Sequence, residues 1–235
     1  MSTVIEKKRE GFKLLLERKK HILIVSLPEN KLEFAQAAVE GGADAIKLHL
    51  NVVHRATGRM FPSWSEEKRN IERICELDIC VGVVPGGRNH FATERDLVEM
   101  QEVGICFIDF FVDYAPSYVM KVELARMFGL NDFSQICCIQ AAQDLKPDAL
   151  ELSIVPEERY GERLTVGDLL RYSKAVNSSS VPCFVPSEKK IEPSEVLSIL
   201  SCGVKGIIIG PIVTGTSLKE FSQAVRVFRR CMDSF

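Results

Sequence analysis

The sequence predicts an α/β fold, a single (β/α)8 TIM barrel with an extra N-terminal helix, on the strength of two observations. Short apolar segments of strand length alternate along the chain with longer amphipathic segments of helical period. No proline- or serine-rich linker and no shift of composition divides the 235 residues, so we expect one domain over residues 1–235. Eight strand–helix units fit this length, whereas the runner-up, a doubly wound open sheet, lacks a GxGxxG motif after its first strand.

The expected strands are recognised as short apolar runs bounded by turn residues. They cover residues 21–27, 44–50, 79–84, 105–112, 135–140, 149–154, 181–186 and 204–210. The segment before residue 21 predicts the extra helix, and amphipathic stretches fill most of the later gaps. Each of those helices would return the chain to the start of the next parallel strand.

Capping chemistry marks where several of these helices begin and end. The expected first turns contain Ser63 with Glu66, Thr93 with Asp96, Thr165 with Asp168, and Pro193. The expected ends lie near Gly41, Gly104, Gly129 and Gly203. The pattern therefore supports helices between the strands rather than long irregular loops.

Composition excludes several classes of partner. The formal net charge is −2, so we expect neither nucleic acid nor a membrane as a partner. The apolar run Leu14–Leu16 is far too short for a membrane span or a secretory signal, which favours a cytoplasmic location. The eight cysteines lack CxxC spacing and are expected to be reduced, and we expect no metal and no other cofactor. A homo-oligomer is compatible with the sequence.

Polar side chains occupy one face of several expected strands. Because strand side chains alternate, the apolar face packs under the helices and the polar face points into the barrel. The residues placed inside are Lys47, His49 and Asn51 on the second strand, Asp109 and Asp113 on the fourth, Gln140 near the end of the fifth, and Glu151 and Ser153 on the sixth.

Charged groups inside a barrel are costly unless they are paired, so Lys47, Asp109 and Glu151 are expected to lie together. One interpretation is a structural ion-pair network that fills the barrel. The other is a catalytic group that includes His49, which the position near the active-site mouth favours. His49 with the two carboxylates could also bind a divalent ion, but a lysine in the same layer argues against a metal.

The segment "GVKGIIIGPIVTG", residues 203–215, predicts a phosphate site. An apolar strand ends at Gly210, and the following turn and helix start present main-chain N–H groups that can hold phosphate oxygens. The alternative is a glycine-containing turn with no ligand. The residues expected at this site are Gly210, Pro211, Ile212, Val213, Thr214 and Gly215.

Two loops, residues 51–64 and 155–164, are longer than a strand–helix connection needs and are expected to cover the mouth. They carry cations that suit an anionic substrate, although ordinary surface charge explains some of them. The residues assigned to substrate or phosphate binding from this region and from the mouth are Arg55, Arg59, Asn51, Gln140, Ser187 and Lys189, and the rim is expected to hold Arg88 and His90 as well.

Three segments together resemble a known family: "LIVSLPENKLEFAQAAVEGGADAIKLH", "ICFIDFFVD" and "EKKIEPSEVLSILSCGVKGIIIGPIVTG". They look like the phosphate-binding barrels of the ribulose-phosphate type, and among these the N-acetylmannosamine-6-phosphate 2-epimerases. The resemblance implies a phosphorylated ligand, with Asp109 at the family's strand-four aspartate and Gly210 with Pro211 to Thr214 on its phosphate loop. It also reveals departures, because Pro85 and Gly86 stand where the family has its catalytic lysine.

A second departure lies on the seventh strand, where the family's glutamate is replaced around Pro186 and Ser187. The stretch "IKLHLNV" is also similar to strand two of orotidine-phosphate decarboxylases, which place a lysine and a histidine there. That family's Asp-x-Lys-x-x-Asp motif on strand three is absent, so decarboxylation is not supported. A phosphorylated ligand is implied more firmly than any one reaction.

The sequence therefore leads to an isomerase or epimerase that acts on a small sugar phosphate by proton transfer next to a carbonyl. Glu151 or Asp109 would be the base, and Lys47 or His49 would stabilise the enolate oxygen. A Schiff-base aldolase is weaker, because two carboxylates favour a charged Lys47. The alternative from another class is a barrel that has lost catalysis and binds or senses a phospho-ligand. The charged interior favours the enzyme.

Overall fold

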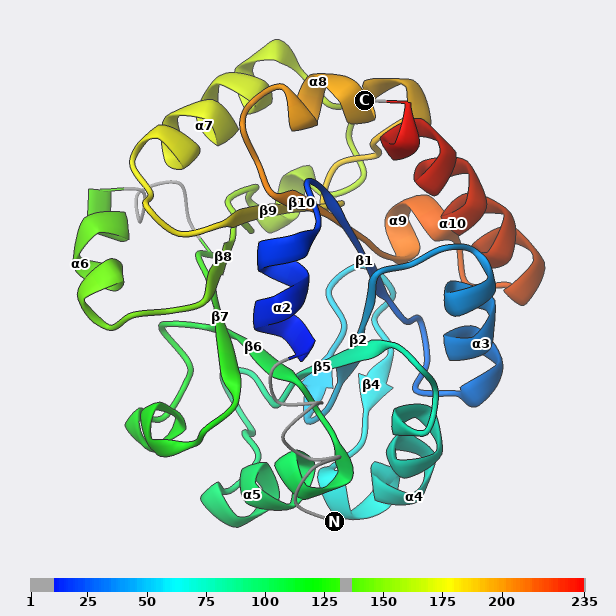
Figure 1. Cartoon of the computed structure of the whole chain (residues 1–235), viewed down its shortest axis with the longest axis vertical. Coiled ribbons are helices and arrows are strands. Elements are labelled where there is room, and N and C mark those ends of the chain that lie inside the picture. The colour runs from blue at the N-terminus through cyan, green and yellow to red at the C-terminus, as the bar shows by residue number, and fades with distance from the viewer. Residues whose placement is uncertain (1–10, 132–136, 235) are drawn as a thin grey trace.

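The computed structural model describes residues 11–131 and 137–234, and it confirms the (β/α)8 barrel. Eight parallel strands close in the order β1-β10-β9-β8-β7-β6-β5-β2 (Figure 1). These strands are β1 (Ile22–Ser26), β2 (Ala45–His49), β5 (Cys80–Val84), β6 (Phe107–Phe111), β7 (Ala125–Gly129), β8 (Ala149–Glu151), β9 (Cys183–Pro186) and β10 (Gly206–Ile209). Because the first strand pairs with the last, the barrel has no open edge.

Helices surround this barrel, and the predicted N-terminal helix is present as α2 (Gly11–Arg18) (Figure 1). The others are α3 (Leu32–Glu40), α4 (Trp64–Cys75), α5 (Glu94–Val103), α6 (Ile139–Asp144), α7 (Val166–Asn177), α8 (Val196–Leu200), α9 (Pro211–Thr214) and α10 (Leu218–Asp233). The 3₁₀ turns η1 (Ser117–Lys121), η3 (Glu157–Arg159) and η4 (Pro193–Glu195) lie in the connections. The first long loop contains a hairpin, β3 (Val52–Val53) and β4 (Met60–Phe61).

The expected capping pairs are confirmed, since Ser63–Glu66, Thr93–Asp96 and Thr165–Asp168 each form a reciprocal capping box. Gly41 and Gly104 end α3 and α5, and Gly104 adopts the left-handed conformation that favours glycine. The expectation for Gly129 is wrong, because this residue ends β7 instead of a helix.

The fifth predicted strand is also wrong. Of residues 135–140, the first two lie outside the described residues, and the rest form a helical turn and the start of α6. The true strand, β7, contains Arg126, which breaks the apolar run in the sequence. The guanidinium group leaves the barrel wall and donates to the carbonyl of Met120 at 3.2 Å. A short apolar run such as 135–140 cannot by itself distinguish a buried strand from a helix.

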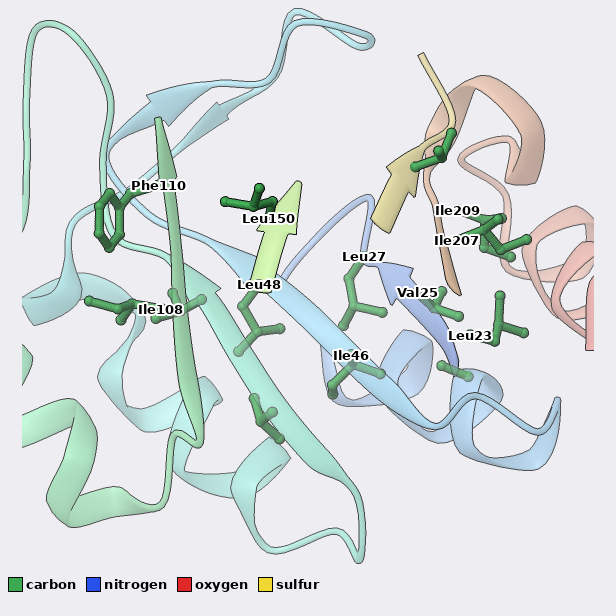
Figure 2. Packing of buried hydrophobic residues seen from close by; sticks show 14 of the residues in the cluster. Leu23, Val25, Leu27, Ile46, Leu48, Ile108, Phe110, Leu150, Ile207 and Ile209 are labelled. Carbon is green, nitrogen blue, oxygen red and sulfur yellow. The ribbon is translucent and has the colours of Figure 1, made fainter. Parts of the chain in front are cut away.

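The main core lies between the strands and the helices. Ile46, Leu48 and Leu150 are fully buried in it, together with apolar residues of β1, β6 and β10 (Figure 2). Ile46 and Leu48 alternate along β2 with Lys47 and His49. The outward packing of the leucine and isoleucine therefore leaves the lysine and histidine inside the barrel.

A second cluster closes the end of the barrel where the strands begin. Phe12 of α2 is fully buried, and its ring stacks on Phe107 at 4.2 Å and lies 6.4 Å from the ring of Phe184. Phe107 takes the space beside Gly82, where an added Cβ would lie 2.1 Å from the Phe107 ring. The aromatic cluster fills this end and leaves the other end for a cavity. Among the described residues no helix has the length and apolar character needed to cross a bilayer.

Candidate active site

A cavity of about 870 Å³ opens where the barrel strands end. Its volume falls in the range typical of small-molecule sites. The predicted residues that line it are Lys47, His49, Asn51, Arg55, Arg88, His90, Asp109, Glu151, Ser153, Ser187, Gly210, Pro211 and Ile212. Seven other predicted residues, Asp113, Gln140, Arg59, Lys189, Val213, Thr214 and Gly215, are not part of its wall. Asp113 is exposed in the turn that follows β6. Most of the expected site is thus brought together, and the exceptions have identifiable physical reasons.

Lys47, Asp109 and Glu151 form an ion-pair triad inside the barrel. The Lys47 ammonium lies 2.7 Å from Asp109 Oδ2 and 2.7 Å from Glu151 Oε2, and at most 7% of each residue is exposed. The three side chains come from β2, β6 and β8, so separate strands hold them at fixed positions. This neighbourhood is the one that the alternation of the strands predicts.

The pKa values of the two carboxyl groups in the triad are shifted in opposite directions. Burial and the nearby Glu151 raise the pKa of Asp109 well above its ordinary value. Burial opposes the ionisation of Glu151, but the Lys47 ammonium and a hydrogen bond from Asp109 outweigh it and lower the pKa of Glu151. For Lys47 too, burial is outweighed, because the two acidic partners raise its pKa. Of the two carboxyl groups, Asp109 therefore holds a proton more readily and Glu151 ionises more readily.

His49 lies beside the triad and pairs with His54 of the hairpin loop, with the ring centroids 4.9 Å apart. Burial, then the charges of His54 and Lys47, lower the pKa of His49 well below its ordinary value. Burial likewise lowers the pKa of His54 to about 4. Both imidazoles are neutral near pH 7, so they offer hydrogen bonds to a substrate without adding charge.

Glu188 is a cavity residue that the sequence reasoning missed. It lies just beyond β9, 5% of it is exposed, and burial raises its pKa to about 7. The carboxylate accepts hydrogen bonds from Ser153 Oγ, from Tyr160 Oη at 2.5 Å and from the Val155 amide at 3.1 Å. A carboxyl group that titrates near neutral pH can either accept or donate a proton there.

Glu188 lies in the charged run "SEKK" at residues 187–190. Such a run is typical of a solvated loop, so the sequence does not indicate that Glu188 is buried. A tight turn, in which the Glu188 amide donates to the carbonyl of Pro186 at 2.9 Å, directs its side chain into the cavity. The signal that was available is its place after the seventh barrel strand, where active-site residues of such barrels lie.

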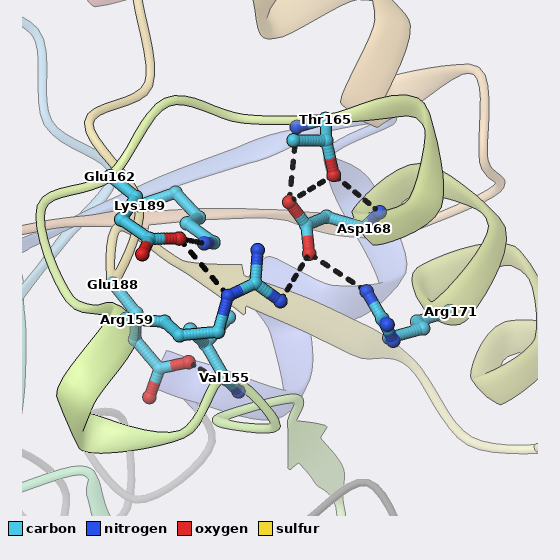
Figure 3. A network of polar contacts seen from close by, with 8 residues as sticks. All are labelled: Val155, Arg159, Glu162, Thr165, Asp168, Arg171, Glu188 and Lys189. Atoms are coloured by element: carbon cyan, nitrogen blue, oxygen red, sulfur yellow. Dashed lines mark hydrogen bonds and ion pairs between the residues drawn. The ribbon is translucent and has the colours of Figure 1, made fainter.

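Lys189 belongs to a different network, which corrects its assignment to the phosphate (Figure 3). Its side chain is completely buried, and Nζ contacts Glu162 Oε2 at 2.8 Å. Arg159 joins this contact by donating to Glu162 at 3.0 Å and by approaching Asp168 at 3.8 Å. Asp168 also accepts from Arg171 at 3.1 Å. The network ties the second long loop to the connection after β9 and leaves Lys189 out of the cavity.

Gln140 and Arg59 also lie elsewhere. Gln140 is exposed on α6, as a consequence of the wrong fifth strand. Arg59 contacts Glu29 at 2.6 Å, outside the cavity wall. Asn51 does line the cavity, and its side-chain amide donates to the carbonyl of Pro85 at 3.1 Å. This hydrogen bond holds the start of the hairpin loop near the end of β5, the third strand of the barrel in chain order.

The turn after β10 is placed as predicted, but the expected pattern of amides is only partly correct. Gly210 and Ile212 line the cavity, and the Gly210 amide donates to Ser187 Oγ at 2.8 Å. The amides of Val213 and Thr214 donate back to the carbonyl of Gly210, at 2.9 and 3.0 Å. The expected anion contacts near residues 213–215 are therefore committed to the turn itself, because α9 is a single turn that closes on its own carbonyls.

Comparisons with known proteins support the fold. The thiamine phosphate pyrophosphorylase from Pyrococcus furiosus aligns with a TM-score of 0.61 at 15% identity, over 92% of this chain and 96% of that one. The phosphoribosyl anthranilate isomerase from Thermus thermophilus gives 0.65 at 14%, over 91% and 98%. The tryptophan synthase from M. tuberculosis gives 0.68 at 13%, over 94% and 98%. All three share this fold.

No family profile and no curated protein sequence matches the chain. At these low identities, the structural likeness concerns the barrel and not its chemistry, so the epimerase resemblance stays a hypothesis. Within residues 11–131 and 137–234, no three His, Cys, Asp or Glu side chains are grouped so as to hold a metal ion. The chemistry of the site must accordingly be argued from the side chains that line it.

Proposed function

We propose that the protein is an isomerase or epimerase that acts on a small phosphorylated sugar by moving a proton next to a carbonyl. The observation that carries the proposal is the Lys47–Asp109–Glu151 triad at the cavity, in which a buried ammonium contacts two carboxyl groups whose pKa values are shifted in opposite directions. Proton transfer next to a carbonyl needs a base, an acid and a positive group near the developing enolate oxygen.

The pKa directions suggest a role for each group. Glu151, ionised, removes the proton, and the C–H electron pair moves to form the enolate. Lys47 stabilises the enolate oxygen, because two of its three N–H groups bind the described carboxylates and the third is available to the substrate. Glu188, with a pKa of about 7, returns a proton to carbon from a second position in the cavity. Asp109, whose pKa is raised, is proposed to hold a proton and to orient Glu151 through the hydrogen bond between the two side chains.

The Schiff-base alternative is disfavoured by the same electrostatics. An imine forms only from an unprotonated amine, and two carboxyl partners raise the pKa of Lys47. The non-catalytic alternative also loses support, since a barrel that only bound a ligand would have no need of a buried charged triad beside the cavity. We keep it as the second candidate because the family's strand-three lysine is absent, as Pro85 occupies that region.

The phosphate is proposed to lie at the turn after β10. Gly210 carries no side chain, and both Gly210 and Ile212 line the cavity. Ser187, which binds the Gly210 amide, would orient the turn. Two of the structural neighbours reported above are a thiamine phosphate pyrophosphorylase and a phosphoribosyl anthranilate isomerase, which agrees with a phosphorylated substrate here.

The site can be tested by proton exchange. Phosphorylated aldoses and ketoses are first ranked by the increase in melting temperature that they cause, since binding to the folded state raises stability. The best ligand is then incubated in deuterated water, and incorporation of deuterium next to its carbonyl is followed by NMR. Lys47→Met should slow exchange by a factor on the order of 10² while leaving phosphate affinity close to normal.

Gly210→Glu provides the converse variant. It places a carboxylate where the phosphate is proposed to bind, so it should abolish binding of the sugar phosphate at this turn. Arg59→Gln is the matched control, because Arg59 lies on the same hairpin loop as the site residues but outside the cavity wall. Deuterium exchange in Lys47→Met at the wild-type rate would contradict the proposed enzyme and favour the binding protein. The absence of exchange for every ligand that binds would do the same.

Two broader properties are proposed with this function. A single domain is supported by the barrel, whose first and last strands pair. A cytoplasmic location is supported by the cysteines, all eight of which are free thiols in the described structure.

A further inference from the structure

We propose that Arg55 and Arg88 form a second anion site, the mouth subsite, and that Glu157 occupies it until substrate binds. The inference rests on the proposed function and extends it, because it assigns the substrate two anionic groups, one at each side of the cavity. Both arginines and Glu157 line the cavity.

The first argument is the bracing of the two guanidinium groups by aromatic rings. The Arg55 guanidinium lies 4.6 Å from the centre of the Phe111 ring, and that of Arg88 lies 5.1 Å from the centre of the Tyr114 ring. Arg88 also donates to Tyr114 Oη at 3.2 Å, and the Phe111 and Tyr114 rings meet edge to face at 5.9 Å. Stacking on an aromatic face fixes the plane of a guanidinium and leaves its edge for an anion.

The second argument is the carboxylate that now pairs with Arg55. Its Nε lies 2.7 Å from Glu157 Oε1, and Nη1 donates to Tyr160 Oη at 3.4 Å. Glu157 is the first residue of η3, and its side chain is 61% exposed, so this carboxylate can move into solvent at little cost. The Glu157 carboxylate therefore takes the position beside Arg55 that we propose for the carboxylate or phosphate of a ligand. Arg88, in contrast, makes no ion pair with any residue that the structure describes.

The third argument is the position of the mouth subsite in the barrel. Phe111 ends β6, whereas Gly210 follows β10. In the closed order of strands, β6 and β10 are separated by three strands on either side, so the two places face each other across the barrel. Lys47 extends into the interior between them from β2. A substrate with anionic groups at both ends would therefore span the cavity and hold its reactive carbon over the triad.

The mouth subsite predicts a competition between Glu157 and a bound anion. An exposed ion pair contributes little to stability, so its removal should strengthen anion binding only by a factor of about three. Loss of one arginine should weaken binding by a factor of about ten, the effect of one charge-assisted hydrogen bond. Both changes lie outside the proton-transfer triad.

The experiment is a phosphorus NMR titration with inorganic phosphate, run in the wild type and in a Gly210→Glu background that blocks the other proposed site. In that background Glu157→Gln should bind phosphate about threefold more tightly, and Arg88→Gln about tenfold more weakly. Glu158→Gln is the matched control, because Glu158 is the neighbouring carboxylate of the cavity wall and makes no described contact with Arg55. It should change nothing.

Equal phosphate affinity in Glu157→Gln and Glu158→Gln would overturn the mouth subsite, as would full affinity in Arg88→Gln. Neither result depends on turnover. If no sugar phosphate exchanges its proton but Glu157→Gln still strengthens phosphate binding, the mouth subsite stands and the proposed reaction fails. If exchange occurs and the titrations show no difference, the reaction stands and the mouth subsite fails.

Discussion

Replacing Lys47 by methionine should destabilise the protein by about 3–5 kcal/mol near pH 8, as expected when one partner of a buried ion pair is removed. Two hydrogen bonds of 2.7 Å donated by the charged ammonium are lost, each worth roughly 1.5–3 kcal/mol. The gross loss of about 3–6 kcal/mol is offset in part, because a buried ammonium no longer has to be desolvated. What remains is mainly the cost of leaving Glu151 as an unpaired buried carboxylate.

The loss should depend on pH with a definite sign. In the wild type the folded state lowers the pKa of Glu151, so its ionised form adds stability above the unfolded carboxyl pKa. Without Lys47, burial dominates and raises the pKa of Glu151, so the folded variant takes up a proton that the unfolded chain does not bind. The variant should therefore be least stable at alkaline pH and recover part of the difference as the pH falls towards 5.

Urea unfolding followed by circular dichroism at pH 8 and pH 5 measures both effects. The double variant Lys47→Met with Glu151→Gln is compared with Lys47→Met alone. It removes the Glu151 carboxylate that would otherwise be buried without a counter-charge, so it should regain at least half of the lost stability. Turnover is measured on the same samples, corrected for the folded fraction. A loss that is equal at both pH values and unrelieved in the double variant would refute the electrostatic explanation. Residual folded protein as active as the wild type would refute the catalytic role.

Three further changes have definite outcomes. Burial gives Glu188 a folded pKa of about 7 against an ordinary value of 4.5, so wild-type stability should fall by roughly 3 kcal/mol as pH rises between these values. Denaturant titrations of Glu188→Gln should show most of that dependence removed. Tyr160→Phe deletes a hydrogen bond to the Glu188 carboxylate, so the corresponding limb of the pH–rate profile should move to higher pH, and an unmoved limb would exclude Glu188 from proton transfer. Phe12→Ala should cost about 3–5 kcal/mol of unfolding free energy with phosphate affinity unchanged, whereas altered affinity would mean that the two barrel ends are coupled.

Much of the barrel could be predicted because its strands have a strict side-chain period. On β2 the alternation of Ile46 and Leu48 with Lys47 and His49 places each residue on its observed face. The same rule, with the cost of unpaired buried charge, brings Lys47, Asp109 and Glu151 together before any coordinates are known. These inferences rest on local geometry and on a strong energetic penalty, and such constraints can be read from a single sequence.

The errors arise where a residue's partner decides its place. Arg126 places a charged residue within β7, and its guanidinium donates to the carbonyl of Met120, a contact that no local pattern reveals. Glu188 and Lys189 are adjacent in a charged run, yet both are buried, one in the cavity and the other against Glu162. Which of two neighbouring charges enters the site depends on the direction of a tight turn, and that direction follows from the packed strands rather than from composition.

The aromatic cluster at the closed end of the barrel has a consequence for the order of assembly. Helix α2 precedes every barrel strand in the chain, but Phe12 packs on Phe107 of β6 and near Phe184 of β9, far later in the sequence. The binding surface for this helix does not exist until those strands have been synthesised and have met. Contacts between such distant segments are slow to form and are made late. We therefore expect α2 to dock late in folding, after the strands that carry Phe107 and Phe184 have assembled into the barrel.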